Sequence, residues 1–286
     1  MRLPKTPARA IAALCLILAT PALATPAAPP PTPAFVEVEG GRLAYETCGE
    51  GNPKAVVLLH DGVLGAASWD EIWAPLCKRY RVVRFDRRGY GASARGKGDY
   101  RVVPDIATVM KAAGMERATL VGGSSGGGMA VNFALAHPEA VERLVLVGAS
   151  LDGYAWSDHW NSRNGYIIPR ALIRDFAGVA RAPHIFAPKS GAARARFAAI
   201  LKANPGNLMA GNGVLTGPNA WPRLGEIKVP TLIINGAVDM PDLHAHAGAL
   251  AALIPGAKRE IMPDTGHYPY MEDPGAFLKL VTGFVG

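Results

Sequence analysis

The sequence predicts an α/β fold in which helices flank a mostly parallel central sheet and a helical cap is inserted into the domain. Three observations predict this fold class. Short apolar runs alternate with helical patterns from residue 35 onward, runs such as 55–60 and 143–148 are almost entirely apolar, and the alternation is lost between about 151 and 223. Continuous apolar runs are typical of strands buried on both faces, and strand–helix alternation is typical of a parallel sheet covered by helices.

The first residues have the composition of a targeting segment. Three basic residues precede an apolar run at 10–19, and Ala-Leu-Ala follows at 22–24. This order is typical of a secretory signal, which we predict over 1–24; a buried helix of the folded domain is the alternative. The protein is therefore expected to be periplasmic or secreted, and the apolar run is too short for a stable membrane span.

Length and charge fit one folded domain without a nucleic-acid partner. The proline-rich stretch 25–34 is predicted to be a linker, which leaves 35–286 for the domain. Hydrophobic residues make up 49% of the 286 residues, enough for a sizeable core. The net charge is +7 and falls to +4 without the three basic residues of the signal, so no nucleic-acid binding is expected.

The strands and helices are expected in alternating order along the domain. Two alternating runs, 35–39 and 42–48, are separated by Gly40-Gly41, which predicts a β-hairpin. Further strands are predicted at 55–60, 81–86, 118–123, 143–148, 231–236 and 257–263. Helices are predicted at 68–78 with Ser68 as N-cap, at 101–113 with Pro104 in the first turn, and at 126–136. A further helix is predicted after the strand at 231–236 and ends at about 253, and the last helix is predicted at 274–285.

The interval from about 151 to 223 is rich in aromatic residues and lacks the strand–helix rhythm. We interpret it as a cap inserted into the domain rather than as a separate domain. Its aromatic side chains suggest an apolar pocket, and they include Tyr154, Trp156, Trp160, Tyr166 and Trp221.

The motif Gly-x-Ser-x-Gly occurs twice in the stretch LVGGSSGGGMA, once around Ser124 and once around Ser125. An exposed nucleophile needs a sharp strand-to-helix turn with small flanking residues, because the two backbones approach closely. The strand at 118–121 leads directly into this turn, which favours Ser124 at its tip and places Ser125 at the start of the helix. A glycine-rich turn without catalytic chemistry is the alternative for such a motif taken alone.

The stretch LVGGSSGGGMAVNFALAHPEAVERLVLVG resembles the nucleophile turn, the following helix and the next strand of cap-bearing α/β-hydrolases. The His-Pro pair after the helix has the family's distance from Ser124 and is one residue off for Ser125. FDRRGYGASA, at 85–94, matches a further loop of the family, in which Asp86, Arg87 and Gly89 are expected to be scaffold. The resemblance implies an α/β-hydrolase fold and an esterase-like serine hydrolase.

The family also implies the partners of the serine, in the chain order nucleophile, acid, histidine. The catalytic histidine is expected at His267, in PDTGHYPYMEDP, and the six other histidines are expected to be structural or solvated. The acid is expected at Asp239, in TLIINGAVDMPDLH. Asp152 lies where some members place the acid, Asp242 is expected to cap the next helix but could substitute, and Asp264 is expected to be poorly directed.

Two backbone N–H groups are expected to form the oxyanion hole, those of Ser125 and Gly62. The loop after strand 55–60 reads HDGVLGAASW, and Asp61 stands where the family usually has glycine. Either the Asp61 carboxylate stabilises the turn and points away from the site, or it shapes substrate choice.

The α/β-hydrolase fold also brings two cysteines together. In this fold the strand at 42–48 runs antiparallel to the strand at 81–86, and Cys77 lies four residues before the latter. We therefore predict a disulfide between Cys48 and Cys77, with separate buried thiols as the alternative.

The resemblance implies a small-molecule substrate and no metal or organic cofactor. A small or medium carboxylic ester is expected to be cleaved through an acyl-enzyme. The alternatives are a carbon–carbon bond hydrolase, a cofactor-free haloperoxidase or perhydrolase, and a hydrolase-like binding protein with little turnover. The cap arginines Arg163, Arg170 and Arg174 could meet a substrate carboxylate, although most are expected to be solvated.

Overall fold

The computed structural model describes residues 32–96, 100–210, 214–215 and 219–286. The predicted signal at 1–24 and the linker as far as residue 31 lie outside these ranges. The first strand begins at Ala34, one residue before the expected start of the domain. In the described ranges, no helix has both the length and the apolar character needed to cross a membrane.

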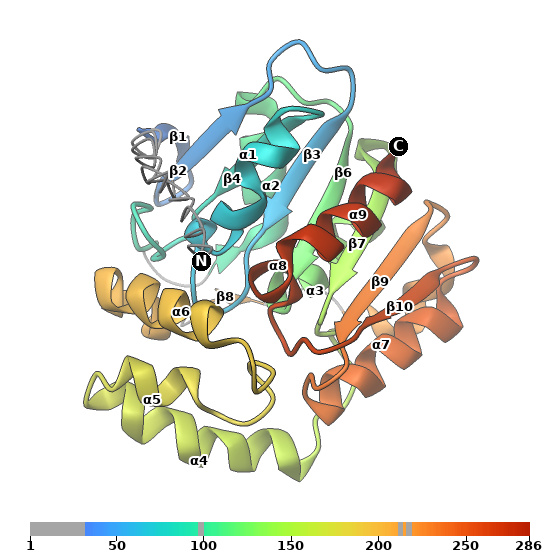
Figure 1. Ribbon diagram of the computed structural model, residues 1–286. Coiled ribbons are helices and arrows are strands. Elements are labelled where there is room, and N and C mark those ends of the chain that lie inside the picture. The colour runs from blue at the N-terminus through green and yellow to red at the C-terminus, as the bar shows by residue number, and fades with distance from the viewer. Residues whose placement is uncertain (1–31, 97–99, 211–213, 216–218) are drawn as a thin grey trace, which may run out of the picture. The chain divides into compact units, whose positions relative to one another are not determined.

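The domain is built on a twisted sheet with strand order β1-β2-β4-β3-β6-β7-β9-β10 (Figure 1). β2 is antiparallel to both of its neighbours, and from β4 to β10 all neighbours are parallel. A short parallel pair, β5 and β8, lies outside the sheet. The strands are β1 (Ala34–Val38), β2 (Gly41–Cys48), β3 (Ala55–Leu59), β4 (Arg81–Phe85), β5 (Tyr100–Arg101), β6 (Ala118–Gly123), β7 (Val141–Val147), β8 (Val214–Leu215), β9 (Thr231–Gly236) and β10 (Lys258–Met262).

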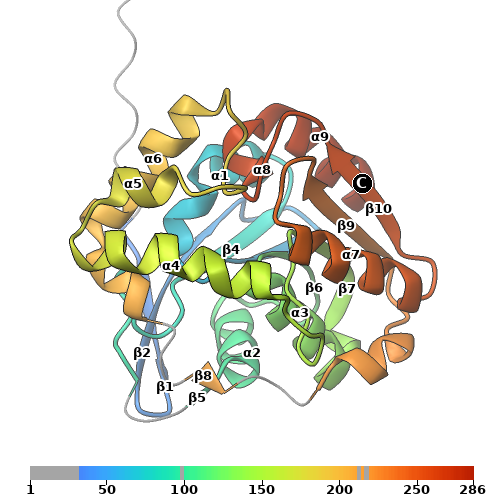
Figure 2. The same cartoon turned by 90° about the horizontal axis from the view of Figure 1, so that it is seen from below.

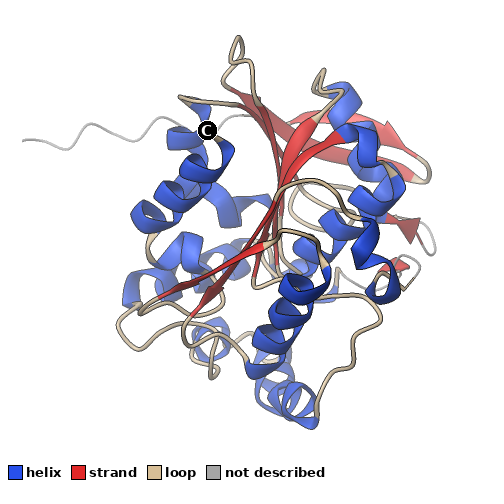
Figure 3. Ribbon diagram, turned by 90° about the vertical axis from the view of Figure 1, so that its right-hand side faces the viewer, coloured by secondary structure: helices blue, strands red, loops and turns tan. Residues whose placement is uncertain are grey.

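Helices cover both faces of the sheet (Figure 3). The α-helices are α1 (Asp70–Cys77), α2 (Val102–Ala112), α3 (Ser125–Ala136), α4 (Asp158–Leu172), α5 (Phe176–Ala180), α6 (Gly191–Ala203), α7 (Pro241–Leu253), α8 (Pro269–Glu272) and α9 (Pro274–Val285). The 3-10 turns are η1 (Ala66–Trp69), η2 (Pro138–Ala140), η3 (Pro205–Met209) and η4 (Trp221–Glu226). α2, α3 and α7 lie on one face, whereas α1, α8 and α9 lie on the other (Figure 2).

The apolar strands account for this two-faced core. All five residues of β3 are buried, and successive side chains point to opposite faces. Val57 and Leu59 pack with the cluster under α2 and α3, whereas Val56 and Leu58 pack with the cluster under α1 and α9. The predicted fold class is therefore confirmed.

Two predicted helix caps are wrong. Ser68 lies inside η1, and α1 begins at Asp70 after Trp69 as N-cap, because the fully buried Trp69 stacks on Tyr270 and sets the path of the chain. Asp242 does not cap α7, since Pro241 opens this helix and Met240 is its N-cap. In both cases a stronger local or tertiary constraint overrides the capping preference.

The predicted disulfide between Cys48 and Cys77 is present, with a Cα–Cα distance of 5.4 Å. Cys48 ends β2 and lies opposite Val82 of the antiparallel β4, while Cys77 ends the helix that leads into β4. The bridge therefore ties the carboxyl end of α1 to the carboxyl end of β2, the second strand of the sheet.

Between β7 and β9 the chain leaves the sheet and forms a helical cap that contains α4, α5 and α6 (Figure 1). The cap lies at the carboxyl ends of the parallel strands, and α4 crosses this end of the molecule (Figure 2). The chain reverses its direction across the sheet at β3, which has β4 on one side and β6 on the other. Open parallel sheets bind ligands at such reversal points, outside the carboxyl ends of the strands.

Candidate active site

Ser124 forms the tip of a strained strand-to-helix turn. β6 ends at Gly123 and α3 begins at Ser125, and between them Ser124 has φ of 52° and ψ of −120°. Positive φ is unfavourable for a residue with a side chain, so the surrounding structure must hold it. The Ser124 N–H donates to the Val147 carbonyl at 2.8 Å, and the Ser124 carbonyl accepts from the Gly127 N–H at 2.9 Å.

The glycines beside the serines are required by the close approach of two backbones. A Cβ atom on Gly122 would lie 2.5 Å from the Gly126 carbonyl oxygen, and one on Gly126 would lie 2.2 Å from the Leu59 carbonyl oxygen. Both distances are far shorter than a Cβ atom tolerates. Close packing therefore requires glycine on both sides of Ser124, as is typical of a nucleophile turn.

The loop after β3 meets the start of α3 beside this turn. A Cβ atom on Gly62 would lie 3.3 Å from the Ser125 hydroxyl, so the structure brings these two residues together. The Gly62 carbonyl accepts a hydrogen bond from the Tyr90 hydroxyl at 2.9 Å, which fixes the orientation of this loop. Ser125 is the first residue of α3, and its N–H is one of the helix donors that have no partner within the helix.

His267 and Asp239 form a buried hydrogen-bonded pair. His267 Nδ1 lies 2.9 Å from Asp239 Oδ1. Because a carboxylate only accepts hydrogen bonds, Nδ1 is the donor, and in the neutral imidazole Nε2 is then the nitrogen with the free lone pair. The Met240 N–H also donates to Asp239 Oδ1 at 2.8 Å, and the Asn235 amide donates to Oδ2 at 3.3 Å. These contacts hold the carboxylate toward the imidazole ring.

The histidine–aspartate pair packs against the strand next to Ser124. A Cβ atom on Gly148, just after β7, would lie 2.9 Å from Asp239 Oδ2 and 3.0 Å from His267 Nδ1. The preceding residue, Val147, binds the Ser124 N–H. Ser124 and His267 thus flank the end of one strand, although the described residues show no hydrogen bond between them. Catalytic hydrogen bonds are often long before substrate binds.

The other candidate acids have different partners. The Asp152 carboxylate accepts a hydrogen bond from the Asn132 amide at 2.5 Å. Asp242 accepts from the Ser157 N–H at 2.7 Å and so joins α7 to the start of the cap helix α4. Asp264 occupies a turn with φ of 54°. Within the described ranges, Asp239 is the carboxylate that hydrogen-bonds to His267.

Asp61, which stands where the family usually has glycine, is fully buried. Its Oδ1 accepts from the Val63 N–H at 2.7 Å, from the Leu64 N–H at 3.0 Å and from the Tyr268 hydroxyl at 3.2 Å. Asp61 therefore stabilises its turn, and it also joins this loop to the residue after His267. Burial raises the pKa of the Asp61 carboxyl, while the two N–H donors and Arg87 act in the opposite direction.

His60 belongs to the scaffold beneath the loop that follows β3. It is fully buried, and its Nε2 accepts from the Arg87 N–H at 3.0 Å. Burial and the nearby charge of Arg87 lower the pKa of His60 well below its usual value. Asp86 accepts from the Ala66 N–H at 2.8 Å and from the Ala92 N–H at 3.1 Å, in keeping with the scaffold role that the resemblance implied.

Glu272 holds the loop that carries His267. One of its carboxylate oxygens accepts from the Gly266 N–H at 2.7 Å. The other accepts from the Ala187 N–H at 2.8 Å and from the Ser190 hydroxyl at 2.6 Å. Glu272 lies in the stretch PDTGHYPYMEDP that carries His267, but its role as a link between the histidine loop and the cap becomes visible only in three dimensions.

The sequence also missed a buried histidine in α7. His246, one of the six histidines expected to be structural or solvated, is fully buried, and its Nδ1 accepts from the Leu151 N–H at 2.9 Å. Burial lowers its pKa. Its ring contacts Trp156, which in turn stacks on Trp160. Trp156 and Trp160, two of the aromatic residues expected to line an apolar pocket, thus stack on each other, and Trp156 also packs against His246.

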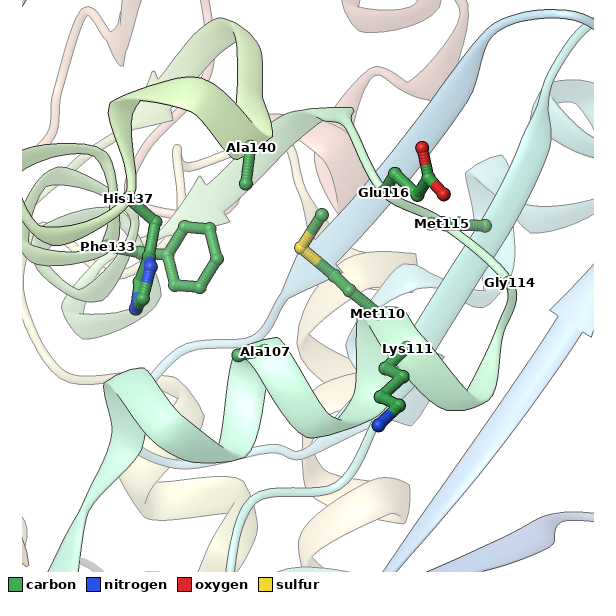
Figure 4. A pocket seen from close by; sticks show the side chains of 9 residues that line it. All are labelled: Ala107, Met110, Lys111, Gly114, Met115, Glu116, Phe133, His137 and Ala140. Atoms are coloured by element: carbon green, nitrogen blue, oxygen red, sulfur yellow. The ribbon is translucent and has the colours of Figure 1, made fainter.

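The pocket in Figure 4 is remote from Ser124 and His267. It has a volume of about 360 Å³ and is lined by residues that include Met110, Phe133 and His137. These residues lie at the carboxyl ends of α2 and α3, on the side where the parallel strands begin. A pocket of about 400 Å³ lies closer to the serine, since it is lined by Ser150, whose N–H donates to the Ser124 carbonyl at 3.1 Å. Among the residues described, no three His, Cys, Asp or Glu side chains are grouped to hold a metal ion.

Residues 56–280 match the alpha/beta hydrolase family, and the chain belongs to this family. A 2-hydroxy-6-oxo-6-phenylhexa-2,4-dienoate hydrolase of Burkholderia cepacia is 30% identical over 283 residues, which cover 85% of this chain and 91% of the relative. The solved enol-lactonase from Burkholderia xenovorans LB400 superposes with a TM-score of 0.74 at 26% identity, covering 88% of this chain and 99% of that one. The esterase RhEst1 from Rhodococcus sp. ECU1013 gives a TM-score of 0.73 at 26% identity, covering 88% and 97%.

Proposed function

We propose that the protein is a serine hydrolase that cleaves a small or medium carboxylic ester. The observation that carries the proposal is the buried His267–Asp239 pair, placed with the strained Ser124 turn around one strand end. Membership of the alpha/beta hydrolase family and similarity to an esterase and an enol-lactonase support it. Both of these neighbours are named for the cleavage of carboxylic ester bonds.

The proposed reaction proceeds through an acyl-enzyme. His267 Nε2 takes the proton from the Ser124 hydroxyl, whose oxygen attacks the carbonyl carbon of the ester. The N–H groups of Gly62 and Ser125 bind the resulting oxyanion, and each such donor contributes about 100- to 1,000-fold in rate. The alcohol leaves with the proton from Nε2, and water deprotonated by the same nitrogen then releases the acid. Asp239 keeps the imidazole in the required tautomer and stabilises its charged form.

A carbon–carbon bond hydrolase is the second candidate. The Burkholderia cepacia relative, at 30% identity, is named for the hydrolysis of a dienoate rather than of a simple ester. The same serine, histidine and oxyanion donors would serve that reaction. Hydrolysis of a vinylogous 1,5-diketone at a higher kcat/KM than any simple ester would favour this candidate.

We further propose that the protein works outside the cytoplasm. The disulfide between Cys48 and Cys77 supports this location, because such bonds persist in oxidising compartments. The predicted signal over 1–24 supports it independently. Fractionation of cells that express the full chain, followed by N-terminal sequencing, tests the proposal. An intact N-terminus in the cytoplasmic fraction would contradict it.

The ester hydrolase proposal is tested with 4-nitrophenyl acetate and butyrate. Ser124→Ala is expected to abolish turnover, whereas Ser125→Ala is the matched control and is expected to keep much of it, because its backbone N–H is unchanged. Loss in Ser125→Ala but not in Ser124→Ala would show that the nucleophile is misassigned. Binding of these esters without turnover by the folded wild-type protein would favour a binding protein instead.

A further inference from the structure

Arg163 belongs to the cap helix α4, which crosses the end of the molecule where the parallel strands end (Figure 2). The start of α4 is tied to the site, because the Ser157 N–H donates to Asp242 Oδ1 at 2.7 Å and His159 Nδ1 lies 3.5 Å from Asp242 Oδ2. Asp242 is only three residues beyond Asp239. Residues four apart share one face of a helix, so Arg163 lies on the same face as His159.

The Arg163 guanidinium is unusual because it is half-buried and has no anion of its own. Its Cζ lies 4.1 Å from the centre of the Trp160 ring, and its Nε is buried without a hydrogen-bond partner in the described ranges. Within the same ranges, no carboxylate lies within 4.0 Å of its nitrogens. Burial lowers the pKa of Arg163, and the groups that act against this effect are Tyr268, Asp239 and Asp242. The negative charge of Asp239, the partner of His267, thus acts on the charge of this guanidinium.

Three other cap arginines have hydrogen-bond or ion-pair partners, and two more, Arg174 and Arg181, are exposed to solvent. Arg170 donates to the Tyr166 carbonyl at 2.9 Å, and Arg194 donates to the Ala187 carbonyl at 2.6 Å. Arg196 forms ion pairs with Asp70 at 2.8 Å and Glu71 at 2.7 Å. Arg163 is one of the three cap arginines that could meet a carboxylate by sequence, and its side chain is half-buried rather than fully solvated.

We propose that Arg163 is the subsite for a carboxylate group of the substrate, separate from the ester that is cleaved. A partly buried cation is less stable without an anion, and the guanidinium fork matches a carboxylate in two parallel hydrogen bonds. A single negative charge suits the site better than a phosphate dianion, because Asp239 and Asp242 already lie nearby. Trp160 lies against one face of the guanidinium, and the proposed ligand binds at its edge.

The inference rests on the proposed ester hydrolase function and deepens it to monoesters of dicarboxylic acids or similar anionic esters. Such a substrate places its cleaved carbonyl beside Ser124 and its free carboxylate against Arg163. The pairing contributes to substrate binding and leaves the chemical step to Ser124, His267 and Asp239. Selectivity for anionic esters should therefore appear mainly in KM.

The test compares two esters of equal length, 4-nitrophenyl hemiadipate and 4-nitrophenyl hexanoate, which differ in a terminal carboxylate or methyl group. Wild-type protein is expected to have the higher kcat/KM for the hemiadipate. Arg163→Gln is expected to lower the ratio of the two kcat/KM values by about 10- to 100-fold, through KM of the hemiadipate. Arg170→Gln removes the same charge from the same helix, and it is expected to leave the ratio within about twofold.

Two outcomes overturn the inference while the ester hydrolase proposal stands. In one, the ratio is the same in wild-type protein and Arg163→Gln. In the other, both arginine variants lower it equally, as a general loss of positive charge would do. If Arg163→Gln does not fold, Arg163→Lys keeps the charge without the planar fork, and it is expected to lower the ratio by at least threefold; an unchanged ratio contradicts the inference.

A binding measurement separates failure of the inference from failure of the proposed function. If neither ester is cleaved, the ester hydrolase proposal fails, and adipate is then titrated into wild-type protein and Arg163→Gln by calorimetry. Binding that weakens at least tenfold in Arg163→Gln supports the carboxylate subsite without any turnover. Equal binding to both proteins, or no binding to wild-type protein, overturns it.

Discussion

The disulfide between Cys48 and Cys77 should contribute a large share of the stability of this domain. The cysteines are 29 residues apart in sequence, and the bridge closes this loop in the unfolded chain. In the chain-entropy description, a loop of this length lowers the unfolded-state entropy by about 12 cal/mol/K, which is about 3.6 kcal/mol at 25 °C. Replacing both cysteines by alanine removes the bridge and leaves no unpaired thiol.

The assay is urea unfolding followed by tryptophan fluorescence. With an m value of about 3 kcal/mol per M, the Cys48→Ala, Cys77→Ala double variant should unfold at about 1.2 M lower urea than the oxidised wild-type protein. Reduced wild-type protein is the control and should unfold together with the double variant. The reasoning is refuted if oxidised and reduced wild-type proteins share one midpoint, because the bridge would then not constrain the unfolded chain.

Three further predictions concern the site. In a nitrophenyl ester assay, Asp239→Asn should lower kcat on the order of 1,000- to 10,000-fold because the imidazole loses its orientation. Asp152→Asn should lower kcat less than tenfold. The reverse order would reassign the acid to Asp152. Burial raises the pKa of the Asp61 carboxyl, so the folded protein favours its protonated form. The contribution of Asp61 to the free energy of unfolding is therefore present at acid pH and is lost as pH rises through the raised pKa. The urea midpoint of Asp61→Asn should therefore rise relative to wild type between pH 4 and pH 8, and a difference independent of pH would contradict this. The Glu272 carboxylate accepts hydrogen bonds from three donors, whereas the amide in Glu272→Gln keeps one acceptor oxygen. This variant should lower the free energy of unfolding in urea by about 2 kcal/mol, and it should lower kcat because the histidine loop is held less firmly. Unchanged stability and kcat would show that the link is dispensable.

Much of the fold follows from local sequence patterns, because the strands of a parallel sheet are buried on both faces. The continuous apolar run at 55–60 and the turn after residue 123 are examples, and the strand pairing implied by the fold led to the disulfide. Helix starts were less predictable. Trp69 and Pro241 decide where α1 and α7 begin, and both override nearby capping residues.

The contacts that organise the site join residues far apart in sequence, so local patterns do not contain them. The Tyr268 hydroxyl reaches Asp61 across 207 residues, and Glu272 reaches the cap at Ala187 across 85. The half-buried state of Arg163 depends on how α4 crosses the end of the sheet. The sequence named three cap arginines that could meet a carboxylate and could not distinguish Arg163 from Arg170 and Arg174.

The central claim is that Ser124 is a nucleophile activated by His267, and covalent labelling tests it most directly. The folded wild-type protein is treated with a fluorophosphonate probe and digested, and the modified residue is identified by mass spectrometry. We predict a single label on Ser124, with no label in Ser124→Ala and greatly slowed labelling in His267→Ala. A label on Ser125, or no label on folded wild-type protein, would contradict the claim.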